Sequence, residues 1–537
     1  IFPCDVRSMS GDGEWSNIAS KFDDLDVKGS IPRQALDSSI SATIERASLL
    51  DGPVKCEINP NDIEVGKKLG KGAFGTVYKG KLHGKDVAIK KLHVTNMDDE
   101  AQEDFKAEMM IMSKLRHPNV VLFMGSCMQP NNYMMITEHM PRGSLYDILH
   151  DKSIQLSFKQ KMKMAKDAAL GMNWLHCSKP VFIHRDLKTQ NLLVDQNWTV
   201  KVADFGLSHI KKHETPGKGG SYGSIGTPLW MAPEVLQNKE YDESADVYSF
   251  GIVLWELYTQ KEPFEDIETF SAMIDSVVQE QKRPEIPKDC PKKLKKLIEI
   301  CWDADPKKRP KFSQMISAFD SIILEAVIRD ENGRKLWKKY FLGTKLREKV
   351  SWKNFTIALT SIFKETLPQN AQDTRWKCLK TLLVSKGDKV TMEQFSRILE
   401  WFGPMNSLRD FLESVESLLR RPWFHGEISA ADAEKKLSAE KKGTFLVRFS
   451  ARDPGCYAIS VIGSGKQMKH FRVYHKPGLS YLVGTTECAK LEDFITQYSK
   501  NLGLKYMCPG SPFKSIFVAK EEGESCGYEV PDFEKDQ

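Results

Sequence analysis

The sequence predicts a multidomain α+β protein, and three observations lead to that prediction. The chain has 537 residues, which is enough for about three or four domains. With 41% hydrophobic and 28% charged residues, its composition is that of a globular protein. Strand-like and helix-like segments alternate first, helical periodicity follows, and short strands between helices come last. These changes divide the chain into segments 1–57, 58–325, 326–420, 421–518 and 519–537.

Composition excludes several classes of function. The net charge of +6 is small for this length and does not favour nucleic acid as a partner. The 11 cysteines are scattered, so we expect no zinc site, no disulfide framework and a reducing compartment. No apolar run approaches the roughly 20 residues that cross a bilayer, and no secretory signal is present. The sequence therefore predicts a cytoplasmic protein without a transmembrane segment.

The two ends of the chain differ in composition from its middle. Residues 1–57 are rich in Ser and Asp and show weak periodicity, so we expect a flexible leader; whether it carries regulatory sites stays open. The chain begins at Ile1 rather than Met, so we expect the native N-terminus to lie outside it. Residues 519–537 are acidic, which is typical of a disordered tail.

A glycine-rich stretch near the start of segment 58–325 has the spacing of a phosphate-binding turn. "GKGAFGTV" (70–77) fits G-x-G-x-x-G-x-V, in which glycines let backbone amides approach phosphates closely. Alone it also fits an ordinary hairpin, but "VAIK" follows and places the charge of Lys90 within reach of the α- and β-phosphates of ATP. The nucleotide-binding residues predicted here are Leu69, Gly70, Lys71, Gly72, Ala73, Phe74, Gly75, Thr76, Val77, Ala88 and Lys90.

Further along, "HRDLKTQN" (184–191) combines an acid, a base and a metal ligand. Asp186 is suited to orient the acceptor hydroxyl or accept its proton, and Lys188 to neutralise the transferring phosphoryl group. Asn191 is suited to hold a magnesium ion. The segment therefore predicts phosphoryl transfer.

Three more elements complete this chemistry. "DFG" supplies Asp204 as a second magnesium ligand, and "APE", ending at Glu234, closes the segment that follows. Lys90 needs an anchor, and Glu108 on a helical stretch is the predicted partner.

Together, and in this order, these motifs resemble the eukaryotic protein kinase family over roughly residues 60–325. The resemblance implies a bilobal protein kinase fold, ATP and Mg²⁺ as cofactors, and protein substrates. It also implies that Thr137 is a small gatekeeper beside the adenine, to which Glu138 and Met140 offer backbone hydrogen bonds.

The same resemblance implies two supporting interactions. Glu234 is expected to pair with Arg309, and Asp246 to brace the backbone of the catalytic loop.

The residue type that receives the phosphate is indicated by the catalytic loop. Lys188, two residues after Asp186, and Thr227 in "GTPLWMAPE" are typical of serine/threonine kinases. "DVYSFGIVLWEL" and "CWDADPKKRP" instead resemble tyrosine kinases. This mixture resembles the tyrosine-kinase-like group, so we predict serine/threonine specificity and leave tyrosine phosphorylation open as a second activity.

Between "DFG" and "APE" the chain carries several hydroxyl side chains. Arg185 precedes the catalytic aspartate, and an arginine there is suited to bind a phosphate on this activation loop. Alternatively, the hydroxyls are ordinary loop composition. The predicted phosphorylation sites are Thr215, Ser221, Tyr222 and Ser224.

Segment 326–420 is helical and contains two similar pieces. "VSWKNF" (350–355) and "VTMEQF" (390–395) lie 40 residues apart and resemble the end of an EF-hand loop running into its exit helix. "LLVSKGDKV" before the second piece lacks the acidic ligands of a calcium loop. We therefore expect a helical EF-hand-like spacer that binds no calcium; coincidental similarity of two helices is the alternative.

Segment 421–518 contains an arginine in the middle of an apolar strand. In "GTFLVRFS", Arg448 and Ser450 share one face because side chains alternate along a strand. His470 and Arg472 share a face of a nearby strand. An arginine is seldom buried without a counter-charge, so these four donors predict a pocket for a phosphorylated ligand; pairing with a carboxylate of the same domain is the alternative.

"RPWFHGEISAADAEKKL" together with "GTFLVRFS" resembles the Src-homology-2 domain over about residues 421–518. The resemblance implies a central antiparallel sheet flanked by two helices, with Arg448 gripping phosphotyrosine. Ser450 and loop 451–454 are implied to contact the phosphate, and His470 the ring. Ala430 stands where many such domains have a second arginine, and whether Arg452 or Arg472 compensates stays open.

Kinase, helical spacer and Src-homology-2 domain in this order resemble the Shk family of dual-specificity kinases. The resemblance implies an enzyme recruited to tyrosine-phosphorylated proteins, including those at the membrane periphery. The alternative is a phosphotyrosine-binding scaffold with a structural kinase domain, against which the complete catalytic set argues.

Overall fold

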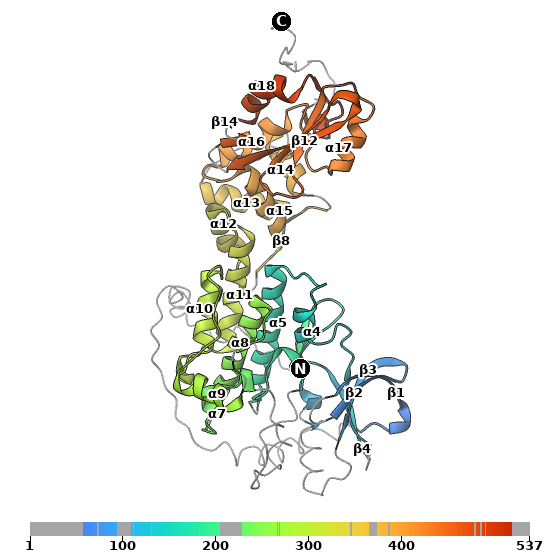
Figure 1. Ribbon diagram of the computed structural model, residues 1–537, viewed down its shortest axis with the longest axis vertical. Helices are drawn as coiled ribbons and strands as arrows, with labels where there is room; N and C mark the ends of the chain where they lie inside the picture. The colour runs from blue at the N-terminus through green and yellow to red at the C-terminus, as the bar shows by residue number, and fades with distance from the viewer. Residues whose placement is uncertain are drawn as a thin grey trace. The chain divides into compact units, whose positions relative to one another are not determined.

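Figure 1 shows the computed structural model, which describes residues 57–517 except 72–74, 94–108, 111, 130–131, 180, 205–227, 266, 268, 344–345, 365–372, 385–386, 477–479, 484–485 and 489. The chain forms two compact units, one ending at Ile316 and the other beginning at Ser317. Apart from Glu57, the predicted leader and tail lie outside the described residues. The predicted segment boundaries stay predictions.

An antiparallel sheet opens the N-terminal unit, with strands in the order β1-β2-β3-β5-β4. The strands are β1 (Ile63–Lys71), β2 (Gly75–Leu82), β3 (Lys85–Leu92), β4 (Phe123–Gln129) and β5 (Asn132–Glu138). The consecutive antiparallel strands predicted between residues 62 and 92 are confirmed as β1, β2 and β3.

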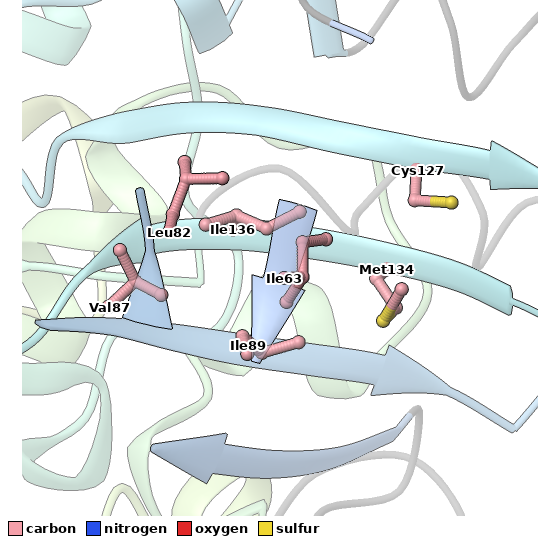
Figure 2. Close-up of a cluster of buried hydrophobic side chains, with 7 residues drawn as sticks. All are labelled: Ile63, Leu82, Val87, Ile89, Cys127, Met134 and Ile136. Atoms are coloured by element: carbon pink, nitrogen blue, oxygen red, sulfur yellow. The ribbon is translucent and has the colours of Figure 1, made fainter. Parts of the chain in front are cut away.

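One face of this sheet is closed by apolar side chains (Figure 2). Along β3, Val87 and Ile89 are fully buried while Ala88 and Lys90 between and after them are partly exposed. Successive side chains of a strand point to opposite faces, so β3 separates the core from an open face. The buried cluster consists of Ile63, Leu82, Val87, Ile89, Cys127, Met134 and Ile136.

The rest of this unit is mostly helical. Helix α8 (Ser244–Thr259) is buried on all sides from Ala245 to Leu257, as expected for a helix that is apolar all round. The other helices are α4 (Leu145–His150), α5 (Phe158–His176), α7 (Pro233–Leu236), α9 (Phe270–Ile274), α10 (Lys292–Cys301) and α11 (Phe312–Val327). Short elements are the 3₁₀ turns η3 (Thr189–Asn191) and η5 (Pro228–Trp230) and the hairpin β6 (Leu192–Val194) and β7 (Val200–Val202).

Helix α5 approaches the β6–β7 hairpin at a glycine. A Cβ on Gly171 would lie 2.3 Å from Asn119 O and 2.7 Å from Val202 Cγ2. These neighbours are tied together, because Val202 N donates to Asn119 O at 2.9 Å and Asn119 Nδ2 to Val200 O at 3.0 Å. A larger residue at position 171 would therefore push against fixed backbone.

The second unit begins with helices around a two-stranded ribbon. Strands β8 (Lys349–Ser351) and β9 (Lys389–Thr391) pair antiparallel with Val350 opposite Val390. Each leads directly into a helix, α13 (Trp352–Phe363) or α15 (Met392–Phe402), so the two similar sequence pieces occupy equivalent places. The other helices are α12 (Glu331–Phe341), α14 (Thr374–Leu383) and α16 (Leu408–Leu419).

A second sheet completes this unit, with strands in the order β14-β13-β12-β11-β10-β15. They are β10 (Thr444–Phe449), β11 (Tyr457–Ile462), β12 (Met468–Lys476), β13 (Ser480–Val483), β14 (Thr486–Cys488) and β15 (Tyr506–Met507). Helices α17 (Ala430–Leu437), α18 (Leu491–Leu502) and α19 (Lys514–Phe517) accompany the sheet. None of the helices in the described residues is long and apolar enough to cross a membrane.

Replacement of Gly171 by alanine tests the close approach at α5. Alanine favours an isolated helix by about 1 kcal/mol, yet we expect Gly171→Ala to destabilise the N-terminal unit by about 1–3 kcal/mol through overpacking. Differential scanning calorimetry measures the shift. Gly333→Ala in α12 is the matched control, because its nearest neighbour is the movable Leu399 Cδ1 at 2.6 Å. An unchanged or raised melting temperature for Gly171→Ala would contradict the steric argument.

Candidate functional site

The residues predicted to surround a nucleotide share the open face of the N-terminal sheet. Lys90 is directly opposite Val77 on β2, and Ala88 is opposite Thr137 on β5. Residues paired across strands or two apart along one strand lie on the same face, so these four side chains form one patch. All four are partly exposed, whereas the opposite face is closed by the core cluster. This face is therefore able to receive a ligand.

The glycine turn lies at the edge of this patch. Its flanking strands pair Gly70 with Val77 and Lys71 with Thr76. Leu69 is 50% exposed, and a Cβ on Gly75 would lie 2.5 Å from Lys91 O, so β2 and β3 come together only with glycine there. Gly72, Ala73 and Phe74 lie outside the described residues.

Lys90 forms an ion pair with a residue far along the chain. Its Nζ lies 2.9 Å from Asp204 Oδ2. Desolvation would raise the pKa of Asp204, but the charge and hydrogen bond of Lys90 outweigh it and hold this pKa below its ordinary value. Asp204 has a positive φ of 57°. Glu108, the predicted partner of Lys90, lies outside the described residues, so that pairing stays a prediction.

The three predicted residues of the catalytic loop lie together. Lys188 Nζ is 3.1 Å from Asp186 Oδ1. Asn191 Nδ2 donates to Asp186 O at 2.7 Å and to Asp186 Oδ2 at 3.1 Å. Ala203 N donates to Asn191 O at 2.9 Å, so Asn191 and Asp204 lie on adjoining segments. The structure thus brings a base, a cation and two oxygen ligands to one place.

A buried carboxylate fixes the start of this loop. Asp246 on α8 accepts hydrogen bonds from His184 N at 2.7 Å and Arg185 N at 2.9 Å, which confirms the predicted bracing. His176 Nε2 lies 2.8 Å from the same carboxylate, a contact that the sequence did not reveal. Burial would raise the pKa of Asp246, but the hydrogen bond and charge of His176 reverse the shift and lower it.

A second buried acid on α8 joins the catalytic loop to the turn η5. Glu256 accepts from Thr189 Oγ1 at 2.7 Å and from Trp230 Nε1 at 3.2 Å. Burial raises the pKa of Glu256 to about 7, although both hydrogen bonds oppose the shift. The sequence analysis missed this residue; a glutamate inside an otherwise apolar helix was the available signal.

The predicted adenine-binding segment is anchored from below. Lys201 Nζ lies 2.8 Å from both carboxylate oxygens of Glu138, which also accepts from Leu122 N at 2.8 Å. Glu138 N donates to Leu122 O, so its carbonyl is the group left to face a base. Met140 is buried, and its contact with adenine stays a prediction. Lys201 was not anticipated from the sequence.

The predicted pair of Glu234 and Arg309 is confirmed. Arg309 Nη1 and Nη2 donate to the two carboxylate oxygens of Glu234 at 2.6 and 2.9 Å, and both residues are buried. Such a bidentate pair fixes orientation as well as charge. The predicted phosphorylation sites Thr215, Ser221, Tyr222 and Ser224, and also Thr227, lie outside the described residues.

In the second unit, Arg448 is buried on the central strand β10 and is 6% exposed. Its Nη1 makes only long contacts, at 3.5 Å, with Ile428 O and Phe449 O, and its Nε has no partner among the described residues. Burial lowers the pKa of this guanidinium, while Glu434 opposes the shift. No ion pair joins Arg448 to a carboxylate within the described part of the chain, which disfavours the internal pairing considered above.

The other predicted pocket residues occupy the same face of the sheet. Ala458 pairs with both Arg448 and Arg472, which places the two arginines in one row across three strands. His470 bonds Ser460 Oγ through Nδ1 at 2.8 Å and Glu434 Oε1 through Nε2 at 3.0 Å.

The loop after β10 closes the pocket. Residues 451–456 form this phosphate loop, in which Ser450 Oγ accepts from Asp453 N at 3.2 Å. Arg472 Nη2 lies 3.0 Å from Asp453 Oδ2, so this arginine is committed to the loop. Glu434 and Asp453 were not anticipated from the sequence.

The titration of Glu256 generates a pH prediction. Its folded pKa of about 7 exceeds the ordinary 4.5, so its favourable contribution is complete below pH 4.5 and is lost as the pH rises to about 7. We expect the wild-type chain to lose up to about 3 kcal/mol relative to Glu256→Gln across this range. Denaturant unfolding of both proteins at several pH values measures the difference. A difference that does not change with pH would contradict the assignment.

Comparison with known proteins identifies both units. Residues 63–319 match the protein tyrosine and serine/threonine kinase family, and residues 423–498 match the SH2 domain. Dual specificity protein kinase shkA of Dictyostelium discoideum is 42% identical over 495 residues, covering 88% of this chain and 93% of that protein. In the same organism, shkC is 44% identical over 433 residues (78% and 85%) and shkB is 41% identical over 479 residues (87% and 72%). The chain is therefore a protein kinase with an SH2 domain, and it belongs to the family of dual specificity protein kinases that includes shkA, shkB and shkC.

Proposed function

We propose that this kinase transfers the γ-phosphoryl group of ATP to serine and threonine hydroxyls of proteins, and also to tyrosine. The observation that carries the proposal is the meeting of Asp186, Lys188 and Asn191 beside the Lys90–Asp204 pair. Phosphoryl transfer depends on positioning and charge neutralisation, which these groups supply. Lys188 at 3.1 Å from Asp186 favours serine and threonine. The names of the relatives, dual specificity kinases, support tyrosine as a further acceptor.

The donor set also fits a magnesium ion. Magnesium takes oxygen ligands, uses one or two carboxylates and completes its shell with phosphates and water. Asn191 and Asp204 offer such oxygens on adjoining segments, and the ion would neutralise charge on the phosphates. Asp186 then orients the acceptor hydroxyl, while Lys90 holds the phosphates that precede the transferred group.

Activity is proposed to be switched by phosphorylation at Thr215, Ser221, Tyr222 or Ser224. Arg185 supports this because its Nε is buried and has no partner among the described residues. A phosphate on the activation loop would supply charge-assisted hydrogen bonds to this guanidinium.

The SH2 domain is proposed to recruit the kinase to tyrosine-phosphorylated proteins. Arg448, buried with an unsatisfied fork of donors, is the group that would grip the phosphate. Ser450 borders the same loop, and His470 would pack on the phosphotyrosine ring. The cytoplasm, with recruitment to phosphoproteins at the membrane periphery, is the proposed location.

The spacer between the two domains is proposed to be an EF-hand-like pair that binds no calcium. The ribbon of β8 and β9, each strand leading into a helix, supports the resemblance. Residues 387–391 between the helices carry lysines where a calcium loop needs acids.

A scaffold with a structural kinase domain is the alternative function, and one substitution separates it from catalysis. We expect Asp186→Asn to reduce kcat about 100- to 10,000-fold, because the acceptor hydroxyl loses its base. Transfer of ³²P from labelled ATP, with mass spectrometry of the modified residues, measures this and reports the hydroxyl preference. Asp62→Asn, at an exposed position of the same unit, is the matched control. Equal phosphate incorporation in wild type and Asp186→Asn would favour the scaffold.

Phosphotyrosine binding has its own test. Arg448→Lys keeps the charge but loses the guanidinium fork, so we expect affinity to fall about 10- to 100-fold. Fluorescence anisotropy with a peptide library that carries phosphotyrosine between random flanks measures the affinity. Arg347→Lys, at an exposed spacer position, controls for the exchange. Undiminished binding by Arg448→Lys would remove Arg448 from the site.

A further inference from the structure

The spacer touches the phosphate-binding site of the SH2 domain through a tryptophan. Trp401 lies at the end of helix α15 and is 2% exposed. Its indole Nε1 donates to Cys456 O at 2.9 Å, and its ring centroid lies 4.2 Å from that of Phe449. One spacer side chain therefore contacts both the strand that carries Arg448 and the end of the phosphate loop.

The carbonyl that Trp401 binds also closes this loop. Ser450 N donates to Cys456 O at 2.9 Å, so this oxygen accepts from the loop and from the spacer together. Ser450 Oγ in turn accepts from Asp453 N. A displacement of Cys456 O would thus shift Ser450, one of the groups proposed to contact the phosphate.

A second contact presses the loop against the same helix. Gly455 has a positive φ of 85°, and a Cβ there would lie 2.9 Å from Glu400 O. Only glycine allows the loop backbone to approach the backbone of α15 this closely. The loop is therefore held by its backbone on two sides, at Cys456 and at Gly455.

The rest of the boundary between helix and loop is not filled. A cavity of about 250 Å³ separates them and is lined by residues that include Arg397, Trp401, Ser450 and Pro454. Arg397 forms an ion pair with Glu427 at this boundary. Because packing is interrupted here, the position of the loop depends strongly on the few contacts at its end.

We propose that helix α15 of the spacer is part of the phosphotyrosine-binding site, with Trp401 as a positioning residue for loop 451–456. The SH2 domain of this kinase then needs its spacer for full affinity. This inference rests on the proposed function of Arg448, and it adds a residue outside the matched SH2 region.

Trp401→Phe in the full-length chain tests the hydrogen bond alone, because the aromatic ring remains. We expect affinity for the phosphotyrosine peptide library to fall about threefold to tenfold, the equivalent of one lost hydrogen bond. Amide hydrogen exchange in 451–456 should become faster. Trp376→Phe in α14 is the matched control: this indole N–H is buried and has no partner among the described residues, so its loss should leave binding unchanged.

The backbone contact has its own matched pair. Gly455→Ala and Gly465→Ala both place a Cβ at a positive φ, of 85° and 66°, but a Cβ at Gly465 meets nothing within 4 Å. Both variants carry similar local strain, and only the first pushes against α15. We expect Gly455→Ala to weaken binding by about tenfold or more and Gly465→Ala to bind like the wild type.

The outcomes separate this inference from the proposed function. If Arg448→Lys loses binding while Trp401→Phe and Gly455→Ala bind like the wild type, the positioning role is wrong and phosphotyrosine binding stands. If the wild-type chain does not distinguish the phosphorylated library from the unphosphorylated one, both fail. Loss of binding in Trp401→Phe and Trp376→Phe alike would also overturn the proposal, since it would indicate general destabilisation of the spacer.

Discussion

The catalytic arrangement depends on one buried carboxylate. Asp246 lies in the middle of the most deeply buried helix and accepts two consecutive backbone amides, His184 N and Arg185 N, together with His176 Nε2. A charge in such a place is stable only when donors surround it, and here the catalytic loop supplies most of them. The loop therefore cannot adopt another backbone path without leaving an unpaired charge in the core. The position of Asp186 follows from this constraint, because it comes directly after the two bound amides.

The second unit uses a buried charge in the opposite manner. Arg448 lies in a fully apolar strand, yet the described residues give its guanidinium only long contacts and leave Nε without a partner. Asp246 is a satisfied charge that fixes a fold, whereas Arg448 is an unsatisfied one that the fold keeps for a ligand. The surrounding sheet and the spacer helices supply the packing that offsets this cost. The same physical rule thus produces a rigid brace in one unit and a binding site in the other.

The sequence revealed the groups whose spacing is local. Asp186, Lys188 and Asn191 lie within one turn of chain, and alternation along β10 places Arg448 and Ser450 on one face. The long-range partners Glu256, Lys201 and Trp401 were missed, since each bonds a residue at least 55 positions away. A lone glutamate, lysine or tryptophan has no motif that announces its partner. The paired strands β8 and β9 are an intermediate case: the repeated Val was visible, but only the structure shows Val350 opposite Val390.

The acids beside the phosphate pocket have a consequence for selectivity. Arg472 is bound to Asp453, and His470 to Glu434, so much of the positive charge around Arg448 is already neutralised from within the domain. An incoming anion has to exchange places with these carboxylates rather than simply add to a cationic surface. Binding then resembles ion exchange, in which the net gain is the difference between two sets of charge pairs. A small inorganic anion gains little from such an exchange, whereas a phosphate attached to an aromatic ring adds the burial of that ring.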